Sequence, residues 1–146
     1  MFLHEFVNKG AEALFGILNL LEFAGFQNHA FELIGEMGDE ESQCAKKIDD
    51  HPNVKRWIRN LEHASAGGFN LPLSPGRFFP DFLAELNDER IAIVEYKGKQ
   101  RAELKSELHK AEVGKLWAER SEGKCVFAWV VNRDWARLEA KLNPVS

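Results

Sequence analysis

The chain has few of the features that mark secreted proteins or polyanion-binding proteins. Its two cysteines, Cys44 and Cys125, stand far apart and form no CxxC pair, so a disulfide framework is not expected and both thiols should be buried in a reduced compartment. The 19 Lys and Arg residues are outnumbered by 23 Asp and Glu residues, which gives a formal net charge of -4. Contact with a polyanion would therefore need a local basic patch.

The sequence also lacks an uninterrupted apolar stretch long enough for a bilayer. The leucine-rich segment 1–26 is broken by Glu12, Asn19 and Glu22, whereas a membrane helix needs about 20 apolar residues. A secretory signal would have a basic start and a small-residue cleavage site, and neither is seen. We therefore expect residues 1–38 to form an amphipathic helical segment that packs on the core or on a partner. The expected location is the cytoplasm, without membrane contact.

Residues 39–146 can bury one hydrophobic core, and their pattern predicts a single α/β domain, or α+β by some conventions. The expected elements are a helix at 39–50 with Asp39 as its N-cap, strands at 54–61, 78–86, 91–97 and 125–131, and a helix at 102–120. The final strand carries no charge, which is typical of a strand covered on both faces. Its position after a helix predicts that it lies parallel to a neighbouring strand.

In the helix expected at 102–120, a glycine and a stripe of apolar residues should face the sheet. Gly114 should allow the helix to approach the sheet closely. Its apolar residues predict an inward stripe, while the charges between them, including Glu103, Glu107 and Glu112, are typical of a solvated face. The expected inward residues are Leu104, Leu108, Ala111 and Leu116.

Two carboxylates interrupt the apolar rows of the central strands. Because side chains alternate along a strand, Asp81 shares a face with Leu83, and Glu95 shares a face with Ile93 and Lys97. Burying one ionised carboxylate is costly, and two facing carboxylates also repel each other. A bound cation would resolve both problems.

Two carboxylates, completed by water and phosphate oxygens, are ligands that suit Mg²⁺. The pattern therefore predicts hydrolysis of a phosphodiester bond. Lys97 would orient the attacking water or offset charge in the transition state. The alternative is an ion pair of purely structural importance between Asp81 and Lys97.

At these residues the sequence resembles the PD-(D/E)XK nuclease superfamily, with Pro80 and Asp81 followed by Glu95, Tyr96 and Lys97. Four stretches are similar, more narrowly, to the endonuclease domain of type III restriction enzyme subunits. They are WIRNLE at 57–62, FFPDFLAEL at 78–86, VEYKGK at 94–99 and LWAERSEGKC at 116–125. The similarity extends over residues 39–132. It implies a restriction endonuclease-like core, with a mixed central sheet and helices on both faces.

The resemblance also implies roles for individual residues. Asp81 and Glu95 would bind Mg²⁺, which Mn²⁺ could replace, together with the backbone carbonyl of Tyr96, and Lys97 would act on the water. A glutamate from the first helix would complete the site. Glu41 is expected because it lies on the stripe of the helix that faces the sheet, with Glu40 to one side of it. The alternatives are Glu85 and Glu62.

The expected substrate is DNA, with Lys99 and Arg101 contacting phosphates beside the site. In similar domains the nuclease follows a helicase motor, and this chain has no GxxxxGK[ST] phosphate loop. A helicase or methyltransferase subunit would then be a separate chain, in restriction or another helicase-coupled process. A homodimer would make it easier to cut both strands. Two rival hypotheses are a catalytically silent interaction module on the same fold and a structure-selective resolvase or repair nuclease.

Overall fold

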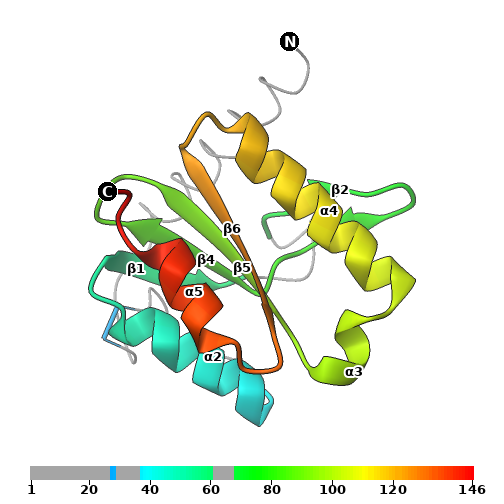
Figure 1. Cartoon of the computed structure of the whole chain (residues 1–146), viewed down its shortest axis with the longest axis horizontal. Coiled ribbons are helices and arrows are strands. Elements are labelled where there is room, and N and C mark those ends of the chain that lie inside the picture. Colours follow the sequence, from blue (N-terminus) through cyan, green and yellow to red (C-terminus); the bar gives the residue numbers. More distant parts are fainter. Residues whose placement is uncertain (1–26, 29–36, 61–67) are drawn as a thin grey trace.

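The computed structural model describes residues 27–28, 37–60 and 68–146 of the chain. The expected N-terminal helical segment lies almost wholly outside these residues. The described part has a mixed α/β fold, in which helices cover both faces of a central sheet (Figure 1). The fold class expected from the sequence is confirmed at this level.

The described part of the chain contains four helices and six strands. They are α2 (Asp39–Asp50), β1 (Val54–Arg59), β2 (Leu71–Pro72), β3 (Arg77–Phe78), β4 (Phe82–Leu86), β5 (Ile91–Lys97), α3 (Lys99–Ala102), α4 (Lys105–Arg120), β6 (Cys125–Val131) and α5 (Trp135–Leu142). The central sheet has the order β1-β4-β5-β6, and β2 and β3 form a separate two-stranded sheet. β1, β4 and β5 are antiparallel neighbours, whereas β6 runs parallel to β5, so the predicted parallel pairing is confirmed.

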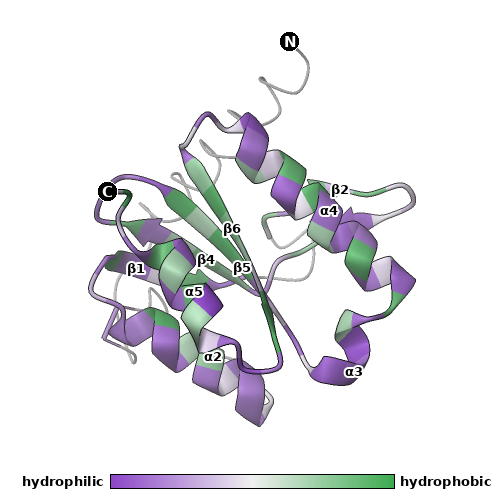
Figure 2. Ribbon diagram, viewed as in Figure 1, coloured by the Kyte–Doolittle hydropathy of each residue, from purple (hydrophilic) through white to green (hydrophobic). Residues whose placement is uncertain are grey.

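Each face of the central sheet has its own hydrophobic core. On one face, α2 and α5 pack against alternate residues of the strands, and the buried thiol of Cys44 belongs to this cluster. On the other face, α4 packs through Trp117 onto Ile93 and Phe127, and Cys125 is buried there. Figure 2 shows the resulting contrast between largely apolar central strands and helices with hydrophilic outer faces. Both cysteines are buried, as expected.

The long strand expected at 78–86 is in fact two strands. Residues 77–78 form β3, which pairs with β2, and pairing with the central sheet begins only at Phe82. Pro80 lies in the gap, and proline lacks the N–H that a sheet ladder needs. The expectation was therefore wrong, and the interruption places Asp81 just outside β4 rather than within it.

The expected start of α2 and the expected helix at 102–120 also need correction. The N-cap of α2 is Gly38, and Asp39 is the first helical residue. The second helix is broken at Glu103 and Leu104 into α3 and α4. Because the register of α4 starts after this break, the predicted inward leucines point outward: Leu104, Leu108 and Leu116 are 51%, 49% and 40% exposed.

The buried residues of α4 are instead Glu107, Gly114 and Trp117. An added Cβ at Gly114 would lie 2.5 Å from the ring of Phe127 in β6. This confirms the predicted role of the glycine in close helix-to-sheet packing. The approach also brings the first turn of α4, with Glu107, close to the end of β5.

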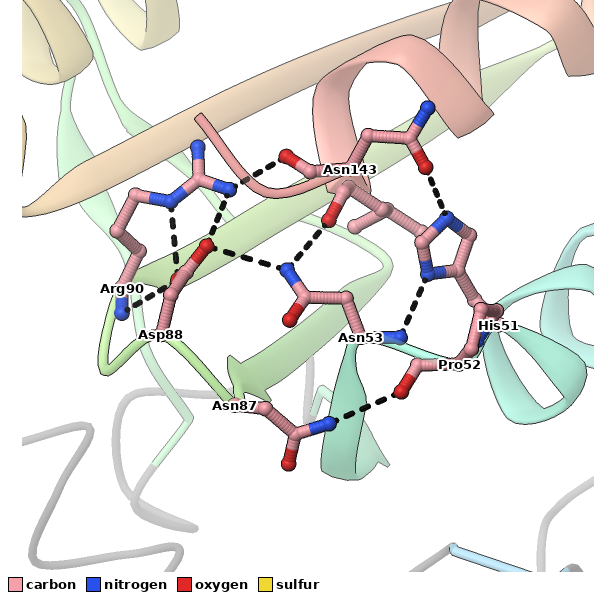
Figure 3. Close-up of polar contacts among 8 residues, drawn as sticks. His51, Pro52, Asn53, Asn87, Asp88, Arg90 and Asn143 are labelled. Atoms are coloured by element: carbon pink, nitrogen blue, oxygen red, sulfur yellow. Dashed lines mark hydrogen bonds and ion pairs between the residues drawn. The ribbon is translucent and has the colours of Figure 1, made fainter. Parts of the chain in front are cut away.

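A polar network fastens the end of the sheet where the β4–β5 hairpin turns (Figure 3). The buried Asn53 amide donates to the Leu142 carbonyl (2.8 Å) and to Asp88 (3.2 Å), and its backbone N–H donates to His51 Nδ1 (3.1 Å). Arg90 joins Asp88 to the carbonyl of Asn143. The network ties α2, the hairpin and the end of α5 together, at the opposite end of β5 from Glu95 and Lys97.

Candidate active site

Asp81 is held where β4 and β5 separate. The last residue pair between the two strands is Phe82 with Val94. Two residues further along β5, the Tyr96 N–H donates to the Asp81 side chain, 2.8 Å from Oδ2, and the Asn60 N–H donates to the Asp81 carbonyl at 2.8 Å. The carboxylate thus takes the place of a backbone acceptor in the ladder, which fixes its position between β1 and β5.

Glu95 faces Asp81 from β5. It is 3% exposed, and no group among the described residues donates a hydrogen bond to its buried Oε2 atom. Burial, followed by the nearby negative charge of Asp81, raises the pKa of Glu95 well above its usual range, although Lys97 opposes the shift. The two carboxylates therefore lie close together in a poorly solvated place, as the alternation of side chains had predicted.

Lys97 follows Glu95 on the same face of β5. Its Nζ atom lies 3.1 Å from Glu95 Oε1 and 3.0 Å from Glu107 Oε2. Burial lowers the pKa of Lys97, but the charges and hydrogen bonds of Glu95 and Glu107 outweigh it and raise the pKa overall. The lysine is thus a cation held beside the acidic pair.

The first helix brings two glutamates to the same place. Glu41 forms an ion pair with Arg59 (3.4 Å), and its charge acts with those of Asp81 and Glu95 on the buried Cys44 thiol, whose pKa is raised mainly by burial. Glu40 accepts a hydrogen bond from the Tyr96 hydroxyl and pairs with Arg133 at 3.1 Å. Both glutamates line the cleft, so Glu40 does not lie to one side of the site as expected.

The two other glutamates considered from the sequence have different positions. Glu85 pairs with Arg56 and with Lys55 (3.4 Å) towards the hairpin end of the sheet, where a separate pocket is lined by Lys55, Glu85 and the hairpin. It is therefore wrong as an alternative for the site. Glu62 lies outside the described residues.

A cleft of about 550 Å³ opens over these groups. Acidic residues from α2, with Asp81 and Glu95, line one part of it, and four cations also reach it. These cations are Lys97, Arg101, Lys110 and Arg133. Arg101 was predicted to contact the substrate and lines the cleft, whereas Lys99 is exposed at the start of α3 and is not a lining residue.

The sequence analysis missed two residues that line the cleft, Lys110 and Arg133, and one that contacts Lys97 from behind it, Glu107. Glu107 was assigned to a solvated helix face, Lys110 was not chosen among the helix cations, and Arg133 was not considered. Glu107 could have been found, because it precedes Gly114 by two helical turns and so shares its inward face. Arg133 gave no such signal, because its place depends on the turn after β6, where Asn132 and Arg133 both have positive φ.

The groups present fit a small divalent cation that keeps part of its water shell. No cluster of three or more His, Cys, Asp or Glu side chains with the geometry of a metal site occurs in the described ranges. Mg²⁺ does not need one, because it is usually held by one or two carboxylates with water and phosphate oxygens. The Oε2 atom of Glu95 is an available ligand atom beside Asp81.

The Tyr96 carbonyl is also oriented towards this place. In an antiparallel ladder, the N–H and C=O of one residue point to the same side of the strand. Because the Tyr96 N–H donates to Asp81, its carbonyl faces the Asp81 side of β5. Asp81, Glu95 and this carbonyl could therefore hold the cation together.

Comparison of the chain with protein-family models, curated proteins and solved structures found no match. Within residues 27–28, 37–60 and 68–146, no helix has both the length and the apolar character needed to cross a membrane. The functional interpretation therefore depends on the chemistry of the cleft and on the sequence resemblance.

Proposed function

We propose that the chain is a metal-dependent endodeoxyribonuclease with a PD-(D/E)XK type of site. The observation that carries the proposal is the meeting of Asp81, Glu95 and Lys97 in one cleft, where no described group donates a hydrogen bond to the buried Oε2 atom of Glu95. Structural ion pairs usually satisfy each other, whereas a strongly perturbed acid in a cleft is typical of a functional site.

The topology gives independent support. The order of the main elements is α2, β1, β4, β5, α4 and β6, with an antiparallel β1-β4-β5 unit and β6 parallel to β5. This arrangement agrees with the mixed sheet, covered by helices on both faces, that the resemblance implies. The acidic pair lies where β4 and β5 diverge, and it lines a cleft that a phosphate backbone could approach.

Each group in the cleft then has a chemical task. Asp81, Glu95 and the Tyr96 carbonyl would hold Mg²⁺ or Mn²⁺, which supplies Lewis-acid activation of water and of the phosphate. Lys97 would donate a hydrogen bond to the attacking water or to a phosphate oxygen that gains negative charge. Arg101, Lys110 and Arg133 line the same cleft and would contact neighbouring phosphates.

The substrate we propose is DNA, in restriction or another helicase-coupled process. Local cations must supply the contact, because the overall charge is -4. Binding should therefore depend steeply on salt, as it does when a few lysines and arginines neutralise phosphates.

The test is cleavage of supercoiled plasmid by purified protein in Mg²⁺ or Mn²⁺. The matched variants are Asp81→Asn, Glu95→Gln and Lys97→Met, which keep the approximate shape of each side chain. Asp50→Asn serves as the control, because it removes an exposed carboxylate that pairs only with Lys46 in the described chain. We expect the plasmid to be nicked only when the cation is present. Each cleft variant should reduce the nicking rate at least about a hundredfold, and the control should leave it unchanged.

Two outcomes would contradict the proposal. Equal cutting by wild type and all three variants would identify a contaminating nuclease. Cation binding without cutting of plasmid, single strands, flaps or four-way junctions would favour the catalytically silent interaction module. Cutting confined to junctions or flaps would instead favour the resolvase or repair nuclease.

A further inference from the structure

Lys97 lies between two carboxylates, although the proposed site needs only one of them. The Nζ atom is 3.1 Å from Glu95 Oε1 and 3.0 Å from Glu107 Oε2, and the Lys97 side chain is only 12% exposed. Glu107 comes from α4, a different element from those that carry Asp81 and Glu95. Its presence beside Lys97 was not expected from the sequence.

Glu107 is itself held firmly in place. It is 7% exposed in the first turn of α4, and its second oxygen, Oε1, lies 3.2 Å from Lys110 Nζ. Burial raises the pKa of Glu107, but hydrogen bonds from Lys97 and Lys110 outweigh it and lower the pKa overall. The close packing of Gly114 on Phe127 fixes the helix that carries it. Glu107 is therefore a fixed anion behind Lys97 and Lys110, which line the cleft.

A bound cation would change what Glu95 can do for Lys97. Once Glu95 coordinates a metal ion, the ammonium group of Lys97 and the metal compete for the same carboxylate and repel each other. A second carboxylate on the far side of Lys97 removes this conflict. It keeps the ammonium group within reach of the reacting phosphate and away from the metal.

We infer that Glu107 is a positioning residue, which holds Lys97 on the α4 side of the cleft so that Glu95 is free to bind the cation. The inference rests on the proposed function and extends it to a residue outside the strands. Glu107 touches neither the cation nor the substrate, and its effect on cation binding passes through Lys97.

The test is a double-mutant cycle on Mn²⁺ affinity, measured by titration calorimetry. Glu107→Asp keeps the charge but shortens the side chain by one methylene group, so its contact with Lys97 is lost. Glu112→Asp is the matched control, since Glu112 lies on the same helix with its side chain 80% exposed. The same changes are repeated in a Lys97→Met background. Circular dichroism checks the fold, and Glu107→Gln replaces Glu107→Asp in the cycle should the latter unfold.

We expect Glu107→Asp to weaken Mn²⁺ binding about tenfold when Lys97 is present, and less than about twofold in the Lys97→Met background. Glu112→Asp should change neither value. In plasmid cleavage, kcat should fall about tenfold for Glu107→Asp. An unchanged affinity, or an equal loss in both backgrounds, would overturn the inference and leave the proposed function intact. A wild-type protein that binds no Mn²⁺ would refute both.

Discussion

Replacing Gly114 with alanine tests the close approach of α4 to the sheet, on which the position of Glu107 depends. The new Cβ would lie 2.5 Å from two atoms of the Phe127 ring and 2.7 Å from a third. Carbon atoms in contact normally lie about 3.5 to 4.0 Å apart, so the ring or the helix must move by about 1 Å. The ring is confined by Phe78 and Trp129, each with its ring centroid 6.2 Å away.

The expected cost follows from two opposing terms. Overpacking a close-packed core costs about 1 to 3 kcal/mol, and the short distances put this site near the upper end of that range. Alanine in place of glycine within a helix stabilises the helix by about 1 kcal/mol. Gly114→Ala should therefore lower the free energy of unfolding by about 1 to 2 kcal/mol, as measured by urea denaturation followed by circular dichroism.

A second substitution separates the clash from other effects. Phe127→Leu removes the ring that the new methyl group meets. In that background Gly114→Ala should be neutral, or stabilising by up to about 1 kcal/mol, because only the helix propensity remains. The assigned packing would be refuted if Gly114→Ala stabilised the wild-type protein. It would also be refuted if Gly114→Ala still lowered the free energy of unfolding in the Phe127→Leu background.

Two further substitutions test the acidic pair and the hairpin network. Burial and Asp81 raise the pKa of Glu95, so its stabilising contribution is present below the unfolded pKa and is lost as pH rises through the raised folded pKa. Without added metal, the stability of Glu95→Gln relative to wild type should therefore increase as pH rises from about 5 to about 8. Urea unfolding at several pH values measures it. A difference in the free energy of unfolding that does not change with pH would contradict the raised pKa. Asn53→Ala leaves the Leu142 carbonyl without its donor and should cost about 1 to 3 kcal/mol by the same measurement. Asn87→Ala, which removes only an exposed bond to the Pro52 carbonyl, should cost under about 1 kcal/mol, and equal costs would contradict the network.

Alternation and turn chemistry were enough to predict most of the sheet. The strands at 91–97 and 125–131 have the expected bounds, and the first helix ends at Asp50 as expected. Each of these segments combines a clear apolar period with residues that mark its end. The charge-free sequence of β6 correctly indicated a strand covered on both faces and parallel to its neighbour. Asp81 and Glu95 could be placed together because alternation within each strand, combined with the expected hairpin, brings them to one end of the same strand pair.

The errors arose where tertiary contacts determine which helix face is buried. The leucines of α4 form a plausible apolar stripe, but the helix starts only at Lys105 and buries Glu107, Gly114 and Trp117 instead. A buried glutamate is stable there only because Lys97 and Lys110 approach it from β5 and from the next helical turn. The sequence analysis made no such pairing between β5 and α4, so it missed the anion beside Lys97.

The most direct measurement is a crystal structure of the protein soaked in Mn²⁺, with the ion located by its anomalous scattering. The proposed site predicts one peak between Asp81 and Glu95, at about 2.1 to 2.2 Å from a carboxylate oxygen of each, with Lys97 beside Glu107. A peak elsewhere, or no peak at a Mn²⁺ concentration that supports cleavage, would contradict the claim that these two acids hold a cation in one cleft.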